Sequence, residues 1–389
     1  MKSLLHSFLF FLIILFSFTH KADPLPPASE YSTQIYSELP FPSSNLLSFS
    51  EEFVEAKMGY QAKQIIKILV GEPPQTLKLK LSTAICGIWI LDNRVFKRGL
   101  DVKATNSIED LGMNGKVDYV HGQMVKDQMS FCNVPSNQKI PFVLVDKIDD
   151  ASKIPNNYDG LLGFGYQCHS ASVGNVNLVS MFKGETKVKK DIIAYTVDSD
   201  NGKAIFTLGG YPSKLNLKDL QYRTIPLKTD NTNGHWEVDL HSVFFDDGEM
   251  INLNATLSIG IGGSAFGVNE DLMERIVGKY FADAIDKRKC VLVKEDVWEV
   301  FCDLDYDINS FGKMSLIVGK WNLKLKPSML FRKVKKNKEN KYWFTVVCYK
   351  EFQGQFYLSQ TLLSGINTVV YDRETNTIEV FQGEIVNKN

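Results

Sequence analysis

The chain has 389 residues, of which 44% are hydrophobic and 12% aromatic, enough to form one or more sizeable cores. Its formal net charge is −1 and its isoelectric point is about 6.6, so charge does not favour nucleic acid or an anionic membrane as a partner. Histidines and cysteines nowhere have the spacing of metal ligands, and we predict neither a metal nor a cofactor.

The N-terminus is typical of a secretory signal. Lys2 precedes an apolar run over residues 8–16, which is too short to span a bilayer comfortably. We therefore predict a signal peptide over residues 1–22 and no later membrane span, with an uncleaved signal anchor as the alternative. Residues 23–52 are rich in Pro and Ser and lack sustained periodicity, which predicts a flexible leader or arm.

From residue 65 onward, the pattern predicts short β strands separated by turns. Apolar runs and period-two alternation indicate strands at residues 66–70, 77–81, 205–208, 345–348 and 368–371. An acidic first turn at Asn269–Asp271, followed by an apolar face, predicts a helix. Many short strands in a chain of this length predict a mainly β protein with two lobes.

Several motifs follow one another in a characteristic order. Residues 71–90 contain the Pro73–Pro74 turn, an alternating strand, and Trp89 flanked by aliphatic residues. The later motifs lie at residues 159–165, 192–196, 208–211, 235–240, 325–328 and 367–373. Together they resemble the pepsin-like aspartic peptidase family over roughly residues 53–382. The resemblance implies a bilobal β fold with an interlobe cleft, an N-terminal lobe at 53–212 carrying a flap, and a C-terminal lobe at 213–389.

The catalytic acids of that family are missing at the matching positions. Its active members hold two Asp carboxylates, one from each lobe, which share a proton and activate water. Ser82 occupies the first of these positions and Gly260 the second, and neither Asp-Thr-Gly nor Asp-Ser-Gly occurs anywhere in the chain. We therefore predict no catalytic residue. The neighbouring Thr83, Ile261 and Gly262 are predicted to line the substrate cleft.

Residues 117–122 resemble the family's flap hairpin, whose Tyr closes over the substrate. This assigns Tyr119 to the flap and places His121 near its tip, opposite Ser82. A serine-type hydrolase using Ser82 and His121 is therefore an alternative, although no third orienting acid is evident.

A secretory protein can contain disulfides. The resemblance implies a disulfide between Cys290 and Cys302. The remaining cysteines, Cys86, Cys132, Cys168 and Cys348, can pair in three ways, and the sequence does not choose among them. Asn254-Ala255-Thr256 is the only N-glycosylation sequon, and its occupancy is open because it adjoins an apolar strand.

These observations predict a non-catalytic pepsin-like protein of the secretory pathway, either secreted or resident in an endolysosomal or vacuolar compartment. We expect a monomer that binds a peptide or protein in its cleft through the flap and strand edges. The alternative is an active aspartic endopeptidase, which requires both turn assignments to be wrong. The identity of the ligand is beyond the sequence.

Overall fold

The structure is a computed structural model of the whole chain. The residues it describes are 54–59, 65–91, 105–117, 120–131, 134–149, 158–166, 178–182, 188, 190–198, 203–211, 221–228, 234–261, 265–295, 297–319, 321–336, 339–349, 355–359 and 368–382. The predicted signal peptide and leader, Tyr119, Gly262, Cys132 and Cys168 lie outside these ranges.

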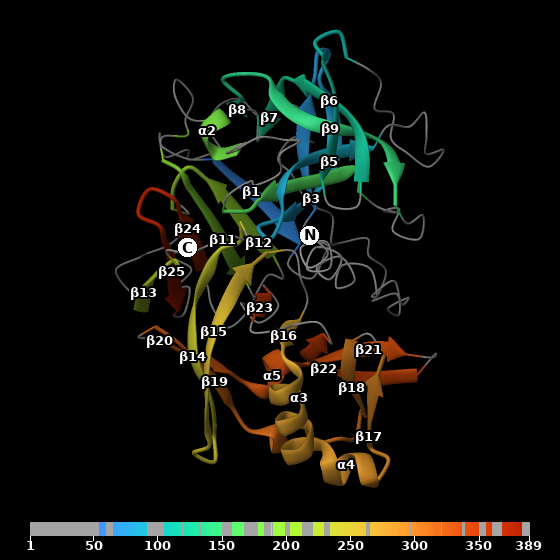
Figure 1. Ribbon diagram of the computed structural model, residues 1–389, viewed down its shortest axis with the longest axis vertical. Helices are drawn as coiled ribbons and strands as arrows, with labels where there is room; N and C mark the ends of the chain where they lie inside the picture. The colour runs from blue at the N-terminus through green and yellow to red at the C-terminus, as the bar shows by residue number, and fades with distance from the viewer. Residues whose placement is uncertain are drawn as a thin grey trace, which may run out of the picture. The chain divides into compact units, whose positions relative to one another are not determined.

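The described residues fall into two compact units. The first unit contains the described residues of 54–226, 234–236 and 368–382, and the second contains Leu227, Lys228 and those of 237–359. Both units are built mainly from β strands (Figure 1). The prediction of a mainly β, bilobal fold of the pepsin type is confirmed, while the predicted lobe boundary near residue 212 stays a prediction.

One sheet of the first unit contains the strands around Ser82. Among the described residues its order is β5-β6-β9-β4-β10-β3-β2-β7-β8. The strands are β2 (Ile65–Val70), β3 (Gln75–Ser82), β4 (Cys86–Leu91), β5 (Glu109–Val117), β6 (Val120–Asp127), β7 (Met129–Phe131), β8 (Val134–Pro135), β9 (Ile140–Ile148) and β10 (Gly160–Phe164). β10 lies between β3 and β4, parallel to the first and antiparallel to the second.

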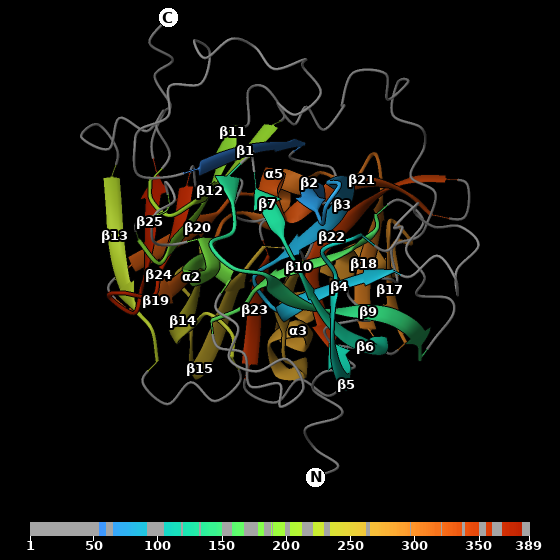
Figure 2. The same cartoon turned by 90° about the horizontal axis from the view of Figure 1, so that it is seen from above.

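A second sheet in the first unit joins segments that are far apart in sequence. Its described order is β1-β12-β11-β24-β25-β13, and β13, β25 and β24 are drawn next to one another in Figure 2. The strands are β1 (Val54–Gly59), β11 (Ile192–Asp198), β12 (Lys203–Leu208), β13 (Gln221–Pro226), β24 (Thr368–Asp372) and β25 (Thr377–Gln382). The last two strands of the chain thus pair with strands of the first unit. The short helix α2 (Leu178–Phe182) also belongs to this unit.

The second unit contains one large sheet. Its described path is β17-β18-β22-β16-β23-β15-β14-β19-β20, and β21 pairs with β22. The strands are β14 (Glu237–Phe245), β15 (Met250–Gly260), β16 (Phe266–Val268), β17 (Cys290–Lys294), β18 (Val297–Asp303), β19 (Met314–Val318), β20 (Trp321–Leu325), β21 (Phe331–Lys336), β22 (Glu339–Tyr349) and β23 (Gln355–Ser359).

The predicted helix begins where the sequence indicated. The Asn269 side chain accepts a hydrogen bond from the backbone N–H of Leu272 and so caps α3 (Glu270–Ile276). Its acidic first turn complements the positive end of the helix dipole. The π-helical turn η3 (Val277–Phe281), α4 (Ala282–Asp286), the 3-10 turn η4 (Ile308–Phe311) and α5 (Pro327–Leu330) complete the helices of this unit's described part.

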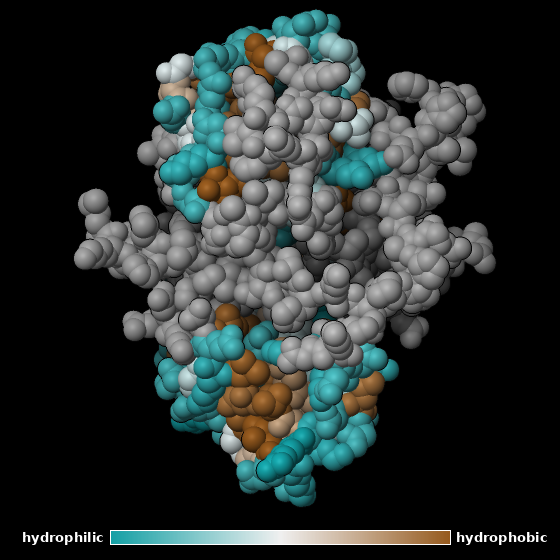
Figure 3. Space-filling view, turned by 90° about the vertical axis from the view of Figure 1, so that its right-hand side faces the viewer, coloured by the Kyte–Doolittle hydropathy of each residue, from teal (hydrophilic) through white to brown (hydrophobic). Residues whose placement is uncertain are grey.

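An aromatic cluster forms part of the second unit's core. Phe281, Phe311, Phe331 and Phe344 are each at most 5% exposed, and their ring centroids lie 5.0 to 6.1 Å apart. Apolar residues also reach the surface of this unit, where they gather in a patch bordered by hydrophilic residues (Figure 3).

The Cys290–Cys302 disulfide is confirmed. The two residues face each other across the antiparallel pair β17 and β18, and their sulfur atoms are bonded. In contrast, Cys348 on β22 is a buried thiol, and burial raises its pKa to about 12. No helix in the described part of the chain is both apolar enough and long enough to cross a bilayer.

Candidate active-site turns

The Ser82 turn is buried and carries no carboxylate. β3 ends at Ser82 and β4 begins at Cys86, so residues 83–85 form the turn between them. Ser82 and Thr83 are only 3% and 1% exposed. The Ser82 hydroxyl oxygen accepts a hydrogen bond of 3.2 Å from the backbone N–H of Ala84, which stabilises the turn locally. The polar atom that the turn presents at this position is a hydroxyl, which at ordinary pH cannot act as a carboxylate does.

β10 supports this turn from between its two strands. Gly163 is the register partner of Ser82 in β3 and of Gly87 in β4. There is no room for a side chain at Gly163, because a Cβ atom there would lie 2.4 Å from the carbonyl oxygen of Ile85. The N–H of Gly165 donates to that same oxygen at 2.9 Å. The backbone of residues 163–165 is therefore packed directly against the turn.

The second unit builds the same arrangement around Gly260. β15 ends at Gly260, whose register partner in the parallel strand β23 is Ser359. The N–H of Ser359 donates to the carbonyl oxygen of Ala265, 3.2 Å away, just before β16 begins. Ile261 follows Gly260 and is fully buried. Gly262, predicted to line the cleft, is outside the described residues.

The strand registers make Ser82 and Gly260 equivalent positions in the two units. β10 and β23 each lie beside the end of the first strand, with Gly163 opposite Ser82 and Ser359 opposite Gly260. Their antiparallel neighbours also correspond, because Gly87 follows Ser82 by five positions and Ala265 follows Gly260 by five. Thr83 and Ile261 are therefore equivalent as well. This correspondence depends on strand pairing and not on any residue identity.

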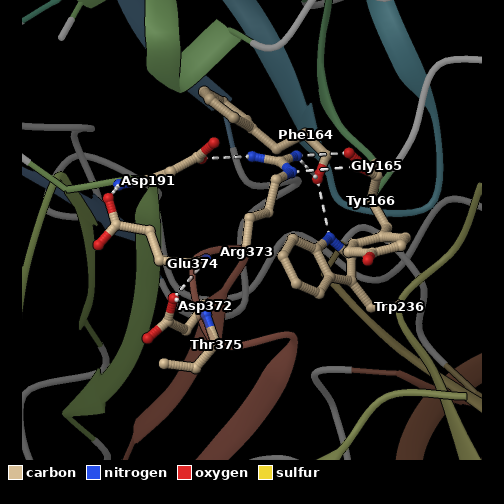
Figure 4. A network of polar contacts seen from close by, with 9 residues as sticks. All are labelled: Phe164, Gly165, Tyr166, Asp191, Trp236, Asp372, Arg373, Glu374 and Thr375. Atoms are coloured by element: carbon tan, nitrogen blue, oxygen red, sulfur yellow. Dashed lines mark hydrogen bonds and ion pairs between the residues drawn. The ribbon is translucent and has the colours of Figure 1, made fainter. Parts of the chain in front are cut away.

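Arg373 anchors the segment Phe164–Tyr166 at the end of β10 (Figure 4). Its side chain donates to the backbone carbonyl oxygens of Gly165 and Tyr166, the latter at 3.0 Å, and Nη1 lies 3.0 Å from Asp191 Oδ1. The ion pair is largely buried, with side-chain exposures of 12% and 14%. Because Gly165 in turn bonds Ile85, the guanidinium fixes the turn through the backbone of β10 and the residues that follow it.

Trp236 adds a second anchor to the same backbone. Its indole Nε1 donates to the carbonyl oxygen of Phe164 at 2.9 Å, and its ring lies 5.1 Å from the Arg373 guanidinium carbon. The rings of Tyr166 and Tyr371 lie 5.2 and 5.0 Å from it. Hydrogen bonds and ring packing therefore hold the backbone that supports the turn, although the turn lacks an acid.

His235 is a further neighbour of this turn, and no sequence motif predicted its contact with Ala84. Burial of the imidazole lowers the pKa of His235 to about 4, and a hydrogen bond with the backbone of Ala84 opposes that shift. The side chain is therefore neutral at ordinary pH. The local sequence Gly-His-Trp does not predict this contact, because the contact depends on the tertiary fold that brings residues 234–236 next to Ala84.

Asp159 does not replace the missing acid. Its carboxylate accepts a hydrogen bond of 2.8 Å from the N–H of Lys78, which lies four residues before Ser82 in β3. Burial raises the pKa of Asp159, and the Lys78 hydrogen bond opposes this shift. The residue fastens the start of β10 to β3, and among the described residues no hydrogen bond joins it to a second carboxylate.

The flap prediction is tested only in part. β5 and β6 form an antiparallel hairpin in which Lys116 faces His121 and Val117 faces Val120. His121 Nε2 lies 2.9 Å from Asp149 Oδ1, so an acid does accompany this histidine. However, no hydrogen bond joins Ser82 to His121 in the described structure, where the Ser82 hydroxyl oxygen accepts from the Ala84 N–H. The structure therefore gives the serine-hydrolase alternative no support.

Within the described ranges, no group of three or more His, Cys, Asp or Glu side chains could hold a metal ion.

The comparisons with known proteins identify the family. The family model for eukaryotic aspartyl proteases matches residues 63–382, which is most of the chain. The chain therefore belongs to the eukaryotic aspartyl protease family. A search of curated proteins finds no match.

Proposed function

We propose that this chain is a non-catalytic member of its family that binds a peptide or protein segment. The observation that carries the proposal is the register equivalence of Ser82 and Gly260, which supports the assignment of both residues, made from the motifs, to the two catalytic positions. Neither residue can ionise, and an aspartic peptidase needs two carboxylates that share one proton. No acidic residue lies between Leu81 and Leu91 or between Leu253 and Asn269 that could substitute.

The intact scaffold supports a retained binding role. Arg373, Trp236 and Gly163 hold a turn that no longer supplies the acid, so the fold around the position is kept while the chemistry is absent. Tyr119, His121 and Gly262 are proposed to contact the ligand, whereas Thr83 and Ile261, which are 1% and 0% exposed, are proposed to support the cleft from inside. An extended peptide can be held by backbone hydrogen bonds to strand edges, which need no dyad.

We further propose that the protein enters the secretory pathway and is secreted or retained in an endolysosomal or vacuolar compartment. The N-terminal apolar run, the Cys290–Cys302 disulfide and the family support this location. The alternative function is active aspartic endopeptidase, which family membership favours on its own.

A peptide-library capture tests both parts of the proposal. The folded mature chain is immobilised, exposed to a library of extended peptides and washed, and the retained peptides are sequenced by mass spectrometry. The matched control is Tyr119→Ala, which removes the ring proposed to close over the ligand.

We expect intact peptides to be retained by the native chain and depleted with Tyr119→Ala. Equal recovery from both proteins, or none from either, would contradict the binding role. Recovery of cleaved fragments would contradict the non-catalytic role and favour the endopeptidase.

A further inference from the structure

We propose that Asn254 carries an N-linked glycan. The proposal rests on the secretory location proposed above, because the transfer reaction occurs only in that pathway. The acceptor sequence Asn254-Ala255-Thr256 lies within β15, which from the sequence alone is an unpromising place for a bulky group.

The strand is interrupted at this residue. In the β14–β15 pair, Leu240 faces Ala255 and Ser242 faces Asn252, so Leu253 and Asn254 together lie opposite the single residue His241. This is a β-bulge, in which an extra residue is released from the regular ladder. Asn254 has φ +45°, a left-handed conformation that Asn tolerates better than most residues. The bulge therefore directs Asn254 out of the ladder.

The surface around Asn254 is open. Asn254 is exposed, and so are Asn252 two residues before it and Asp239 and His241 on the neighbouring strand. Further along the same hairpin, Phe244 and Met250 face each other and are 37% and 56% exposed. A large polar group on Asn254 would thus meet solvent and would not displace a described part of the second unit.

The third residue of the sequon has a separate role in the folded state. Thr256 is 9% exposed, and its hydroxyl accepts a hydrogen bond of 2.9 Å from Lys228 Nζ. Because Thr256 is buried, the enzyme that transfers the glycan could not bind the sequon in the folded protein. The sequon is therefore read on the nascent chain, before β15 pairs with β14, and the folded bulge then leaves the modified Asn254 at the surface.

The reaction needs a lipid-linked oligosaccharide diphosphate as its second substrate. The Asn254 side-chain nitrogen forms a bond to C1 of the first sugar, while the bond between that C1 and the diphosphate oxygen breaks. The amide nitrogen loses one proton, and the lipid diphosphate leaves with the bonding electron pair. No oxidant or reductant is required.

Translation of the full chain in the presence of endoplasmic-reticulum microsomes tests the proposal. One set of chains keeps its own N-terminus and a second carries a heterologous cleavable signal, so that a failure of the chain's own signal is separated from a failure of glycosylation. Protease protection identifies the translocated chains. The variants are Asn254→Asp, which is nearly isosteric and tolerates the same backbone conformation, and Thr256→Ser, which keeps the sequon and a hydroxyl.

We expect translocated native and Thr256→Ser chains to show one discrete increase in apparent mass that an N-glycanase removes, and Asn254→Asp to lose it. Translocated native chains without the increase, or an increase that survives in Asn254→Asp, would overturn the proposal. If only the heterologous signal gives translocation and the increase is present, the glycan site stands and the proposed signal peptide is wrong.

Discussion

Gly163 lies opposite Ser82 in the parallel pair of β10 and β3, where a Cβ atom would be 2.4 Å from the Ile85 carbonyl oxygen. This close approach explains why residue 163 in β10 must be glycine. The turn and the strand that supports it cannot separate to admit a methyl group, because backbone contacts hold them on both sides.

Gly163→Ala should therefore lower the free energy of unfolding by about 1 to 3 kcal/mol, the usual cost of forcing an extra carbon into a packed interior. Denaturant titration measures it. The matched control is Gly278→Ala in η3, where a Cβ would meet nothing within 4 Å and helix propensity favours Ala. A Gly163→Ala protein as stable as wild type would contradict the packing described for this turn.

Arg373→Ala should be more damaging than removal of an exposed arginine. It removes the ion pair with Asp191 and the hydrogen bonds to two backbone carbonyl oxygens in a largely buried site, at a cost of about 3 kcal/mol. Arg275→Ala on the exposed side of α3 is the control and should change stability by less than about 0.5 kcal/mol. Equal effects in the two denaturant titrations would show that the Arg373 network does not hold the turn.

Loss of the Cys290–Cys302 disulfide should destabilise the second unit. The bond closes a loop with a sequence separation of 12. Its removal raises the conformational entropy of the unfolded chain, which for a loop of this length lowers the free energy of unfolding by about 3 kcal/mol. The double variant Cys290→Ser/Cys302→Ser is compared with Cys348→Ala, which removes a thiol that is not cross-linked. Thermal unfolding of the double variant at the same temperature as the native chain would refute the stabilising role.

Stability should fall on acidification through His235. The unfolded chain takes up a proton near pH 6.5, whereas the buried imidazole in the folded chain does so only near pH 4. Between these values the unfolded state binds more protons, so acid favours unfolding, by about 2 kcal/mol at pH 5 relative to neutral pH.

His235→Gln cannot take up this proton and should lose about 2 kcal/mol less between neutral pH and pH 5. Denaturant titrations of both proteins at the two pH values give the difference. An identical pH dependence for the variant and the native chain would show that His235 is not buried as described.

The strands were predictable because their local patterns are strong. Alternation in Leu77–Leu81 and the apolar run of Thr368–Tyr371 identified β3 and β24, and Asn269 identified the start of α3. The pairing of β24 with β11 joins residues about 175 positions apart. Strand patterns give the presence of a strand but carry little information about such distant partners.

Ser82 and Gly260, at the centre of the candidate site, were predictable from the sequence, but the residues that support them were not. The motif order located Ser82 and Gly260, but their equivalence became visible only in the strand registers. Arg373 sits in an Asp-Arg-Glu-Thr turn, where a basic residue is normally solvated, and its contacts with Gly165 and Asp191 depend on tertiary folding. For the same reason, no local pattern marked His235 as a neighbour of Ala84.

The central claim is that neither Ser82 nor Gly260 supplies an acid for peptide hydrolysis. The most direct test incubates the purified mature chain with denatured haemoglobin at acidic pH, with and without pepstatin. The number of free amino termini is measured over time, because each hydrolysed peptide bond produces one. We predict no pepstatin-sensitive cleavage above that of buffer. A pepstatin-sensitive cleavage activity that co-elutes with the folded chain would contradict the claim and show that the chain is an active peptidase.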